Sequence, residues 1–304
     1  MNNRPSGSTA RALQMGLIGL AAVGVALYWA NILDETVAGL ALATAVILVC
    51  CRMATEAFLD VLRRGGARAF VVVLGLVTAG FSLFVAAQSI YPGKPAWVGH
   101  VQKDGDVVAL PGTIQGPVRL LVHGNPAGDG AENVSIHLAA GSEDIHAEIG
   151  RSISSRRLGS RGRGKVVTAH NSAFVSANIA RGVRELHLVT INGALSGPLQ
   201  IEIFAEPIAF NLLIATACAL LLLAIALAAI GDANTRASGA TGMALVYGLM
   251  VHADATPDTS VRAEVGALFV ALFVGYLGAA FLHTVLKVMM SKKATDTRPK
   301  TARR

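Results

Sequence analysis

Six long stretches of this 304-residue chain contain no Asp, Glu, Lys or Arg, and this feature limits the possible folds most strongly. A run of about 20 apolar residues can cross the hydrocarbon core of a bilayer as a helix. Only 15% of the residues are charged, whereas soluble domains have about 25%. We therefore expect a multi-pass α-helical membrane protein embedded in a lipid bilayer. The predicted transmembrane helices cover residues 12–33, 36–53, 69–91, 208–231, 237–253 and 265–287.

The distribution of basic residues predicts the orientation of these helices. A long polar segment, residues 94–206, separates the third and fourth runs, and the other connecting segments are short. Lys and Arg accumulate in the short cytoplasmic loops of membrane proteins. If all six runs span, 14 Lys and Arg residues outside the polar segment lie on the side of the two termini, and one lies opposite. We therefore expect a bacterial inner-membrane protein with both termini cytoplasmic and residues 94–206 periplasmic.

The first and the fifth of the uncharged runs each allow an alternative assignment. Residues 237–253 contain three glycines and form either a span or a re-entrant or interfacial segment, which requires packing against protein at membrane depth. We favour six spans, because five would place the C-terminal tail with its seven Lys and Arg residues outside. The first run has the basic start of a cleaved signal peptide, but it is longer than the usual apolar region of about 7–15 residues.

Residues 94–206 have the pattern of a β-domain. Eight short stretches rich in β-branched residues alternate between apolar and polar positions, with Gly, Pro, Asn and Asp clusters between them. Regularly spaced strands without helical patterns are typical of an antiparallel β-sandwich. The expected fold class is therefore a helical membrane protein with three helices in residues 1–93 and three in residues 207–304, and an inserted all-β sandwich of jelly-roll type.

One predicted strand, "EDIHAEIG", carries a candidate metal site. The two-residue period of a strand places Asp144, His146 and Glu148 on one face, and six of the eight histidines lie within residues 94–206. Carboxylates and imidazoles are ligands of zinc and other divalent metals. The favoured interpretation is that these residues form the solvent face of an ordinary strand, which requires polar side chains at those positions.

A basic stretch, "RSISSRRLGSRGRGK", follows this strand and contains no acidic residue. Its Gly and Ser content predicts a long flexible loop between two strands. This loop is a candidate contact for an anionic partner, such as an acidic protein, an anionic glycan or lipid headgroups. The favoured alternative is a solvated, partly disordered loop without a partner. The candidate contact residues are Arg151, Arg156, Arg157, Arg161, Arg163 and Lys165.

Nucleotides and nucleic acids are not expected partners of this stretch. "GSRGRGKV" has the glycine and lysine spacing of a phosphate-binding loop, but Val166 replaces the required Ser or Thr and a strand-like segment follows it. No aromatic residue lies among the arginines to stack on bases.

The last predicted helix has small residues at strict four-residue spacing, at Ala267, Ala271, Gly275 and Ala279. Small residues let helix backbones approach closely in membranes, so we expect this face to pack against another helix or subunit. No Asp, Glu or Arg lies near the middle of a predicted transmembrane helix. Their absence disfavours a proton-coupled transporter, because such residues mark ion pathways.

These observations favour a non-enzymatic accessory or assembly subunit whose β-domain binds a protein or glycan partner. The sequence identifies no cofactor and no catalytic motif. The alternatives are a copper- or zinc-binding envelope protein and a component of a transporter or channel. A membrane-embedded enzyme that uses few charged residues also stays open.

Overall fold

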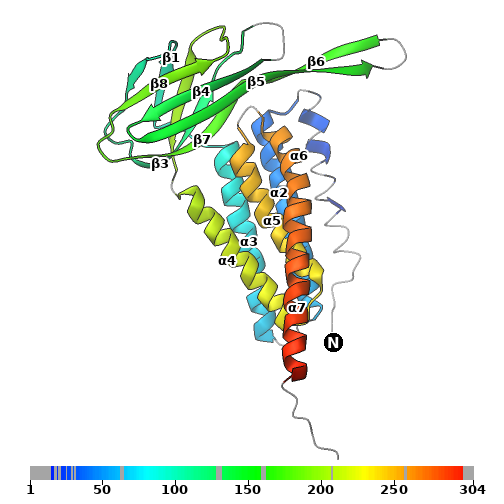
Figure 1. Ribbon diagram of the computed structural model, residues 1–304. Coiled ribbons are helices and arrows are strands. Elements are labelled where there is room, and N and C mark those ends of the chain that lie inside the picture. The colour runs from blue at the N-terminus through cyan, green and yellow to red at the C-terminus, as the bar shows by residue number, and fades with distance from the viewer. Residues whose placement is uncertain are drawn as a thin grey trace, which may run out of the picture. The chain divides into compact units, whose positions relative to one another are not determined.

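The computed structural model consists of two compact units, a helical unit in residues 1–90 and 211–304 and a β-domain in residues 91–210 (Figure 1). The prediction of membrane-length helices combined with a β-domain is confirmed. The structure describes residues 15–16, 19, 22–24, 26–28, 30, 32–61, 65–127, 132–158, 162–206, 208–256 and 259–296, without the side chains of 65–67, 132, 151–158, 162–170 and 292–296.

The helical unit contains four described helices that are long and apolar enough to cross a membrane. The last of them is continuous from α6 through a π-helical segment, η2, into α7. Of the first predicted helix, residues 12–33, twelve residues are described, and those up to residue 28 are helical. The elements are α2 (Glu35–Leu59), α3 (Gly65–Ile90), α4 (Phe210–Ile230), α5 (Thr235–Asp254), α6 (Ser260–Val270), η2 (Ala271–Leu277) and α7 (Gly278–Asp296).

Helix α5, which covers the weakest predicted span, is a regular helix inside the bundle. It contacts α2, α3, α6, η2 and α7, and twelve of its 20 residues are buried. Neighbouring helices therefore surround this segment, and it needs fewer large apolar side chains than a helix that faces lipid. Its many Gly, Ala and Ser residues match this position, because small side chains let the neighbouring backbones approach.

The β-domain consists of two antiparallel sheets, with strand orders β1-β9-β3-β7 and β2-β8-β4-β5-β6. The pairing is nested: β1 pairs with β9, β2 with β8, β3 with β7, and β4 with β5. The strands are β1 (Trp97–Val101), β2 (Val107–Ala109), β3 (Gly116–His123), β4 (Glu132–Ala140), β5 (Glu143–Leu158), β6 (Gly162–His170), β7 (Ser172–Ile179), β8 (Glu185–Asn192) and β9 (Leu199–Ala205).

The two sheets contribute to one hydrophobic core. The two-residue alternation buries Ile136 and Leu138 on β4, and Leu120 and Val122 on β3 belong to the same cluster from the other sheet. Burying apolar side chains contributes about 25 cal/mol for each Å² removed from water. This shared core therefore holds the strands in their register, since a shift by one residue would turn apolar side chains outward.

The predicted loop over residues 151–165 is wrong for the described backbone. Strand β5 continues to Leu158 and pairs with β6 from Gly150↔His170 to Leu158↔Gly162, whereas its pairing with β4 ends at Arg151. Residues 152–158 and 162–168 therefore form a two-stranded ribbon beyond the sheet, which we call the β5–β6 arm (Figure 1). The Gly and Ser content suggested a loop, but β-branched residues on both strands and a continuous backbone ladder support a ribbon.

Candidate functional site

The β5–β6 arm places most of the predicted basic residues on paired backbone. Arg156, Arg157, Arg163 and Lys165 lie within the arm, and Arg151 lies at its base. Arg161 falls outside the described residues. Arg157 and Arg163 occupy directly opposite positions in the register.

The three metal candidates share the exposed face of β5. Asp144, His146 and Glu148 are exposed and alternate with buried residues. The register places His137 of β4 opposite His146, with the two imidazoles stacked at a centroid distance of 4.3 Å. His137 Nε2 also lies 3.3 Å from Asp144 Oδ1.

These side chains do not form a metal centre. Within the described part of the chain, no three His, Cys, Asp or Glu side chains are grouped so that they could hold one metal ion. The copper or zinc hypothesis stays a prediction without a structural site.

One arginine of the β-domain is buried in a specific environment. Arg119 on β3 is 5% exposed, and its guanidinium lies 4.3 Å from the centroid of the Phe174 ring. Burial lowers the pKa of the Arg119 guanidinium to about 10, and the charge of Glu206 partly offsets this effect. Arg119 therefore stays positively charged at neutral pH and is stabilised by the face of an aromatic ring.

The four small residues of the last helix are all buried. At their centre, Gly275 on η2 crosses Gly242 on α5 with the two backbones in contact: a Cβ added to Gly275 would lie 2.6 Å from the carbonyl oxygen of Gly242. A Cβ on Gly242 would lie 2.8 Å from Ala279 Cβ. Neither helix has room for a side chain at this crossing.

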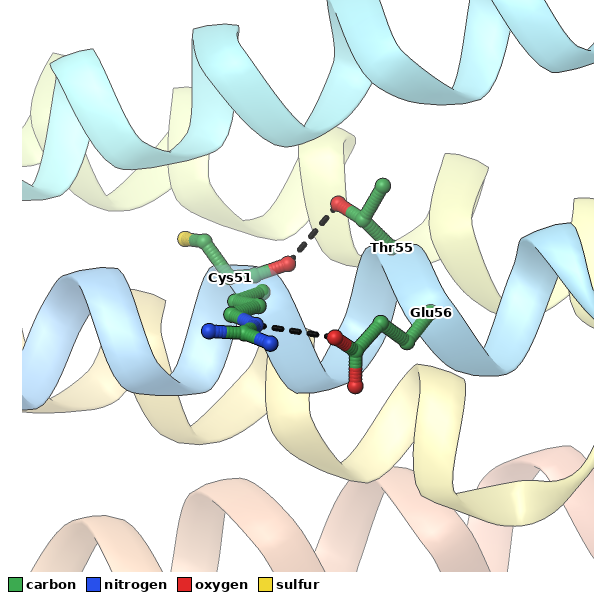
Figure 2. Close-up of polar contacts among 4 residues, drawn as sticks. Cys51, Thr55 and Glu56 are labelled. Carbon is green, nitrogen blue, oxygen red and sulfur yellow. Dashed lines mark hydrogen bonds and ion pairs between the residues drawn. The ribbon is translucent and has the colours of Figure 1, made fainter. Parts of the chain in front are cut away.

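Polar side chains of α2 are paired within the helix, as Figure 2 shows. The Thr55 hydroxyl donates to the carbonyl oxygen of Cys51 at 2.8 Å, and Arg52 Nε donates to Glu56 Oε1 at 2.8 Å. Cys50 and Cys51 are buried. These contacts give the Thr55 hydroxyl and the Nε of Arg52 hydrogen-bond partners on their own helix.

A polar cluster lies buried where α2, α5 and α6 meet. The Tyr247 hydroxyl of α5 donates to Glu264 Oε2 of α6 at 2.9 Å, and both side chains are 0% exposed. Ser260 Oγ donates to the backbone carbonyl oxygen of Glu35 at 3.0 Å. Tyr28 in turn donates to Glu35 Oε2 at 3.1 Å. This group of residues is the polar cluster of the helical unit.

Two buried histidines are also tied to serines on other helices. Ser89 Oγ donates to the carbonyl oxygen of His252 at 2.9 Å and lies 3.1 Å from its Nδ1. Ser238 Oγ lies 2.9 Å from His283 Nδ1. The pairs join α3 to α5 and α5 to α7, so they hold the bundle together through hydrogen bonds as well as apolar packing.

Sequence reasoning missed Glu264. This residue precedes the uncharged run 265–286 by one position, so it was counted with the connecting loop, where an acid is unremarkable. The structure begins α6 at Ser260 and buries Glu264 one turn into the helix. The signal available was the four-residue spacing of Ser260 and Glu264, which puts both on one face if the helix starts early.

No family model, curated protein or solved structure matches this chain.

Proposed function

We propose that this protein is a non-enzymatic accessory or assembly subunit of a bacterial inner membrane whose periplasmic β-domain binds an anionic protein or glycan partner. The proposal includes six spans and cytoplasmic termini. Helix α5, with 20 residues, has a length of about 30 Å at 1.5 Å per residue, which matches a bilayer core. The other added span is the uncharged run of residues 12–33.

We assign the β-domain to the jelly-roll sandwiches. Leaving out β6, the first strand pairs with the last, the second with the one before it, and so on to the innermost pair, β4 and β5. Rolling one long antiparallel hairpin produces this nested order and divides the strands between two sheets. Strand β6 is then an extra strand at the edge of the five-stranded sheet. It pairs with β5, and this pairing forms the arm.

The observation that carries the proposed function is the β5–β6 arm. Residues 151–165 contain six basic residues and no acid, and two arginines are paired across the ribbon. Near an anionic surface, each base contributes about 1 kcal/mol, so six give about 6 kcal/mol at low salt.

The proposal is tested by capturing partners of the full-length protein from native membranes in mild detergent, over a range of NaCl concentrations. We expect one stoichiometric partner whose retention falls with salt, because salt screens exposed charges within about 10 Å at 0.1 M. The arm variant replaces all six bases by Gln and is expected to lose this partner. The substitutions are R151Q, R156Q, R157Q, R161Q, R163Q and K165Q.

The matched control replaces six bases of the C-terminal tail by Gln, which removes the same charge elsewhere. This tail variant is expected to retain the partner. Equal retention by the arm variant and the wild-type protein contradicts the proposal, as does equal loss from both variants. Digestion of the captured sample with a protease or a glycosidase identifies the partner as a protein or a glycan. The tail substitutions are K292Q, K293Q, R298Q, K300Q, R303Q and R304Q.

A further inference from the structure

Glu264 is an acidic residue that lies buried inside the helical unit. Its side chain is 0% exposed and is surrounded by α2, α5 and α6. One carboxylate oxygen, Oε2, accepts the hydrogen bond of Tyr247. The other oxygen, Oε1, is buried and has no hydrogen-bond partner in the protein. A buried ionised carboxylate needs compensation by charge or several donors, and a single tyrosine hydroxyl does not provide it.

The neighbouring charged and titratable groups do not neutralise Glu264. On α2, the carboxyl of Glu35 is close enough to repel a negative charge at Glu264. Cys50, also on α2, interacts with Tyr247, which is the titratable group contributed by α5. On α6 itself, Arg262 is exposed. Within the described residues, no Lys, Arg or His forms an ion pair with Glu264, so none of them supplies a compensating positive charge.

Glu264 Oε1 and Ser260 Oγ both lie against the backbone of α2 at a glycine. A Cβ added to Gly39 of α2 would lie 2.8 Å from Glu264 Oε1 and 2.5 Å from Ser260 Oγ. The two oxygens therefore both face Gly39, and the missing side chain lets α2 form the wall of the site. Ser260 Oγ also contacts the Glu35 carbonyl oxygen. Carboxylate, hydroxyl and carbonyl oxygens are ligands of hard cations.

We propose that Glu264 is the centre of a binding site for a small monovalent cation, a proton or Na⁺, with Tyr247, Ser260 and the Glu35 carbonyl oxygen around it. A bound water would supply a hydrogen bond to Oε1 but leaves the charge in place, whereas a cation removes the charge and engages the free oxygen. Acidic residues inside helical membrane proteins commonly belong to ion or proton paths. The helical unit therefore binds an ion in addition to anchoring the β-domain.

The test follows the thermal stability of the full-length protein in detergent, with a thiol-reactive dye as the reporter. Cys50 and Cys51 are buried in the helical unit, so their labelling by the dye reports unfolding, and a Cys218→Ser background removes the exposed thiol. The Tm of the wild-type protein, E264Q and the control E56Q is measured from pH 5 to pH 9. Each series is run in Na⁺ and in choline buffer. Glu56 is an exposed acid of α2 paired with Arg52.

A bound proton has a defined signature in choline buffer. If a proton is the ligand, it stays on Glu264 in the folded protein in a pH range where the unfolded chain has already ionised this residue, above about pH 4.3. The Tm of wild type then falls relative to E264Q as pH rises. The gap changes by about 3–5 °C for each pH unit in that window. If Na⁺ is the ligand, Na⁺ raises the Tm of wild type and leaves E264Q unchanged. E56Q is expected to follow wild type in both buffers.

Parallel curves for wild type and E264Q in both buffers overturn the proposal. A second measurement requires no variant to fold: dicyclohexylcarbodiimide labels protonated carboxyls in apolar surroundings, and peptide mass spectrometry locates the label. We expect label at Glu264 that declines at high pH, and that Na⁺ suppresses if Na⁺ binds there. Wild-type protein in which Glu264 takes no label even at pH 5 also overturns the proposal.

Discussion

Replacing Gly242 by Ala is expected to weaken the helical unit, because α5 and η2 cross at this residue without room for a side chain. The new Cβ would lie 2.8 Å from Ala279 Cβ and even closer to the Gly275 carbonyl oxygen. Carbon atoms in ordinary contact are about 3.5–4.0 Å apart, so the two helices must separate by about 0.7 Å or more. The neighbour on one side is backbone, which cannot move away by changing a rotamer.

Overpacking of this kind costs about 1–3 kcal/mol, which corresponds to a fall in Tm of about 3–10 °C. The matched control is Gly266→Ala on α6, where an added Cβ meets no atom within 4 Å. The control is expected to change stability by less than about 0.5 kcal/mol. Labelling of Cys50 and Cys51 by a thiol-reactive dye on heating, in a Cys218→Ser background, reports the Tm of each variant.

Equal unfolding temperatures of Gly242→Ala and Gly266→Ala contradict this expectation, because the two variants are compared for the space around the added methyl. A further check is Gly275→Ala, which adds a methyl to the same crossing from the other helix. Once one substitution has separated the helices, the second has less to displace. The double variant is therefore expected to lose less stability than the two single losses added together.

Three other expectations concern the β-domain and a helix start. Leu120→Ala removes a side chain that is 0% exposed and should lower the free energy of unfolding of the β-domain by about 2–5 kcal/mol. The control Val189→Ala, at a 40% exposed position, should lower it little. Trp97 fluorescence in a Trp29→Phe background measures the unfolding of both variants. The backbone N–H groups of Gln102 and Lys103 hold the pKa of Asp106 below its usual value. The stabilisation by Asp106 is therefore present above about pH 4 and is lost as pH falls further. When stability is measured against pH, wild type and Asp106→Asn should converge below about pH 4. A difference in stability that stays constant with pH contradicts this role of Asp106. Asn234 is the N-cap of α5 and accepts a hydrogen bond from the Arg236 N–H. Asn234→Ala should therefore lower the stability of the helical unit by about 0.5–2 kcal/mol. The thiol-dye assay measures this change, and an unchanged Tm contradicts the capping role.

The amount that the sequence predicts depends on the range of the interaction involved. Membrane-length helices such as α3 and α4 follow from long uncharged runs, because transfer of apolar side chains out of water depends on composition alone. Alternating segments such as β8 follow from the two-residue period of a strand. Residues 237–253 were the weakest prediction, since their small residues are explained by surrounding helices that the sequence does not place.

Most contacts of the candidate sites could not be predicted from the sequence. Asp144, His146 and Glu148 share a strand face as the period requires, but the stacking of His146 on His137 depends on the β4–β5 register. The basic residues of the arm were found by composition, whereas their placement on a ribbon depends on pairing with β6. Glu264 was missed because a boundary drawn at the first uncharged residue excludes a carboxyl that the helix buries.

The sequence by itself determined that this chain has membrane-length apolar helices on both sides of a β-rich segment, and that one stretch of that segment is strongly basic. Those properties are local, since hydrophobicity, residue period and charge are fixed by neighbours along the chain. Only the tertiary structure decided that Gly242 meets Gly275, and that Glu264 is enclosed by Tyr247 and Gly39 without a basic partner. These contacts join helices far apart in sequence, and the environment of a buried charge depends on all the elements that surround it.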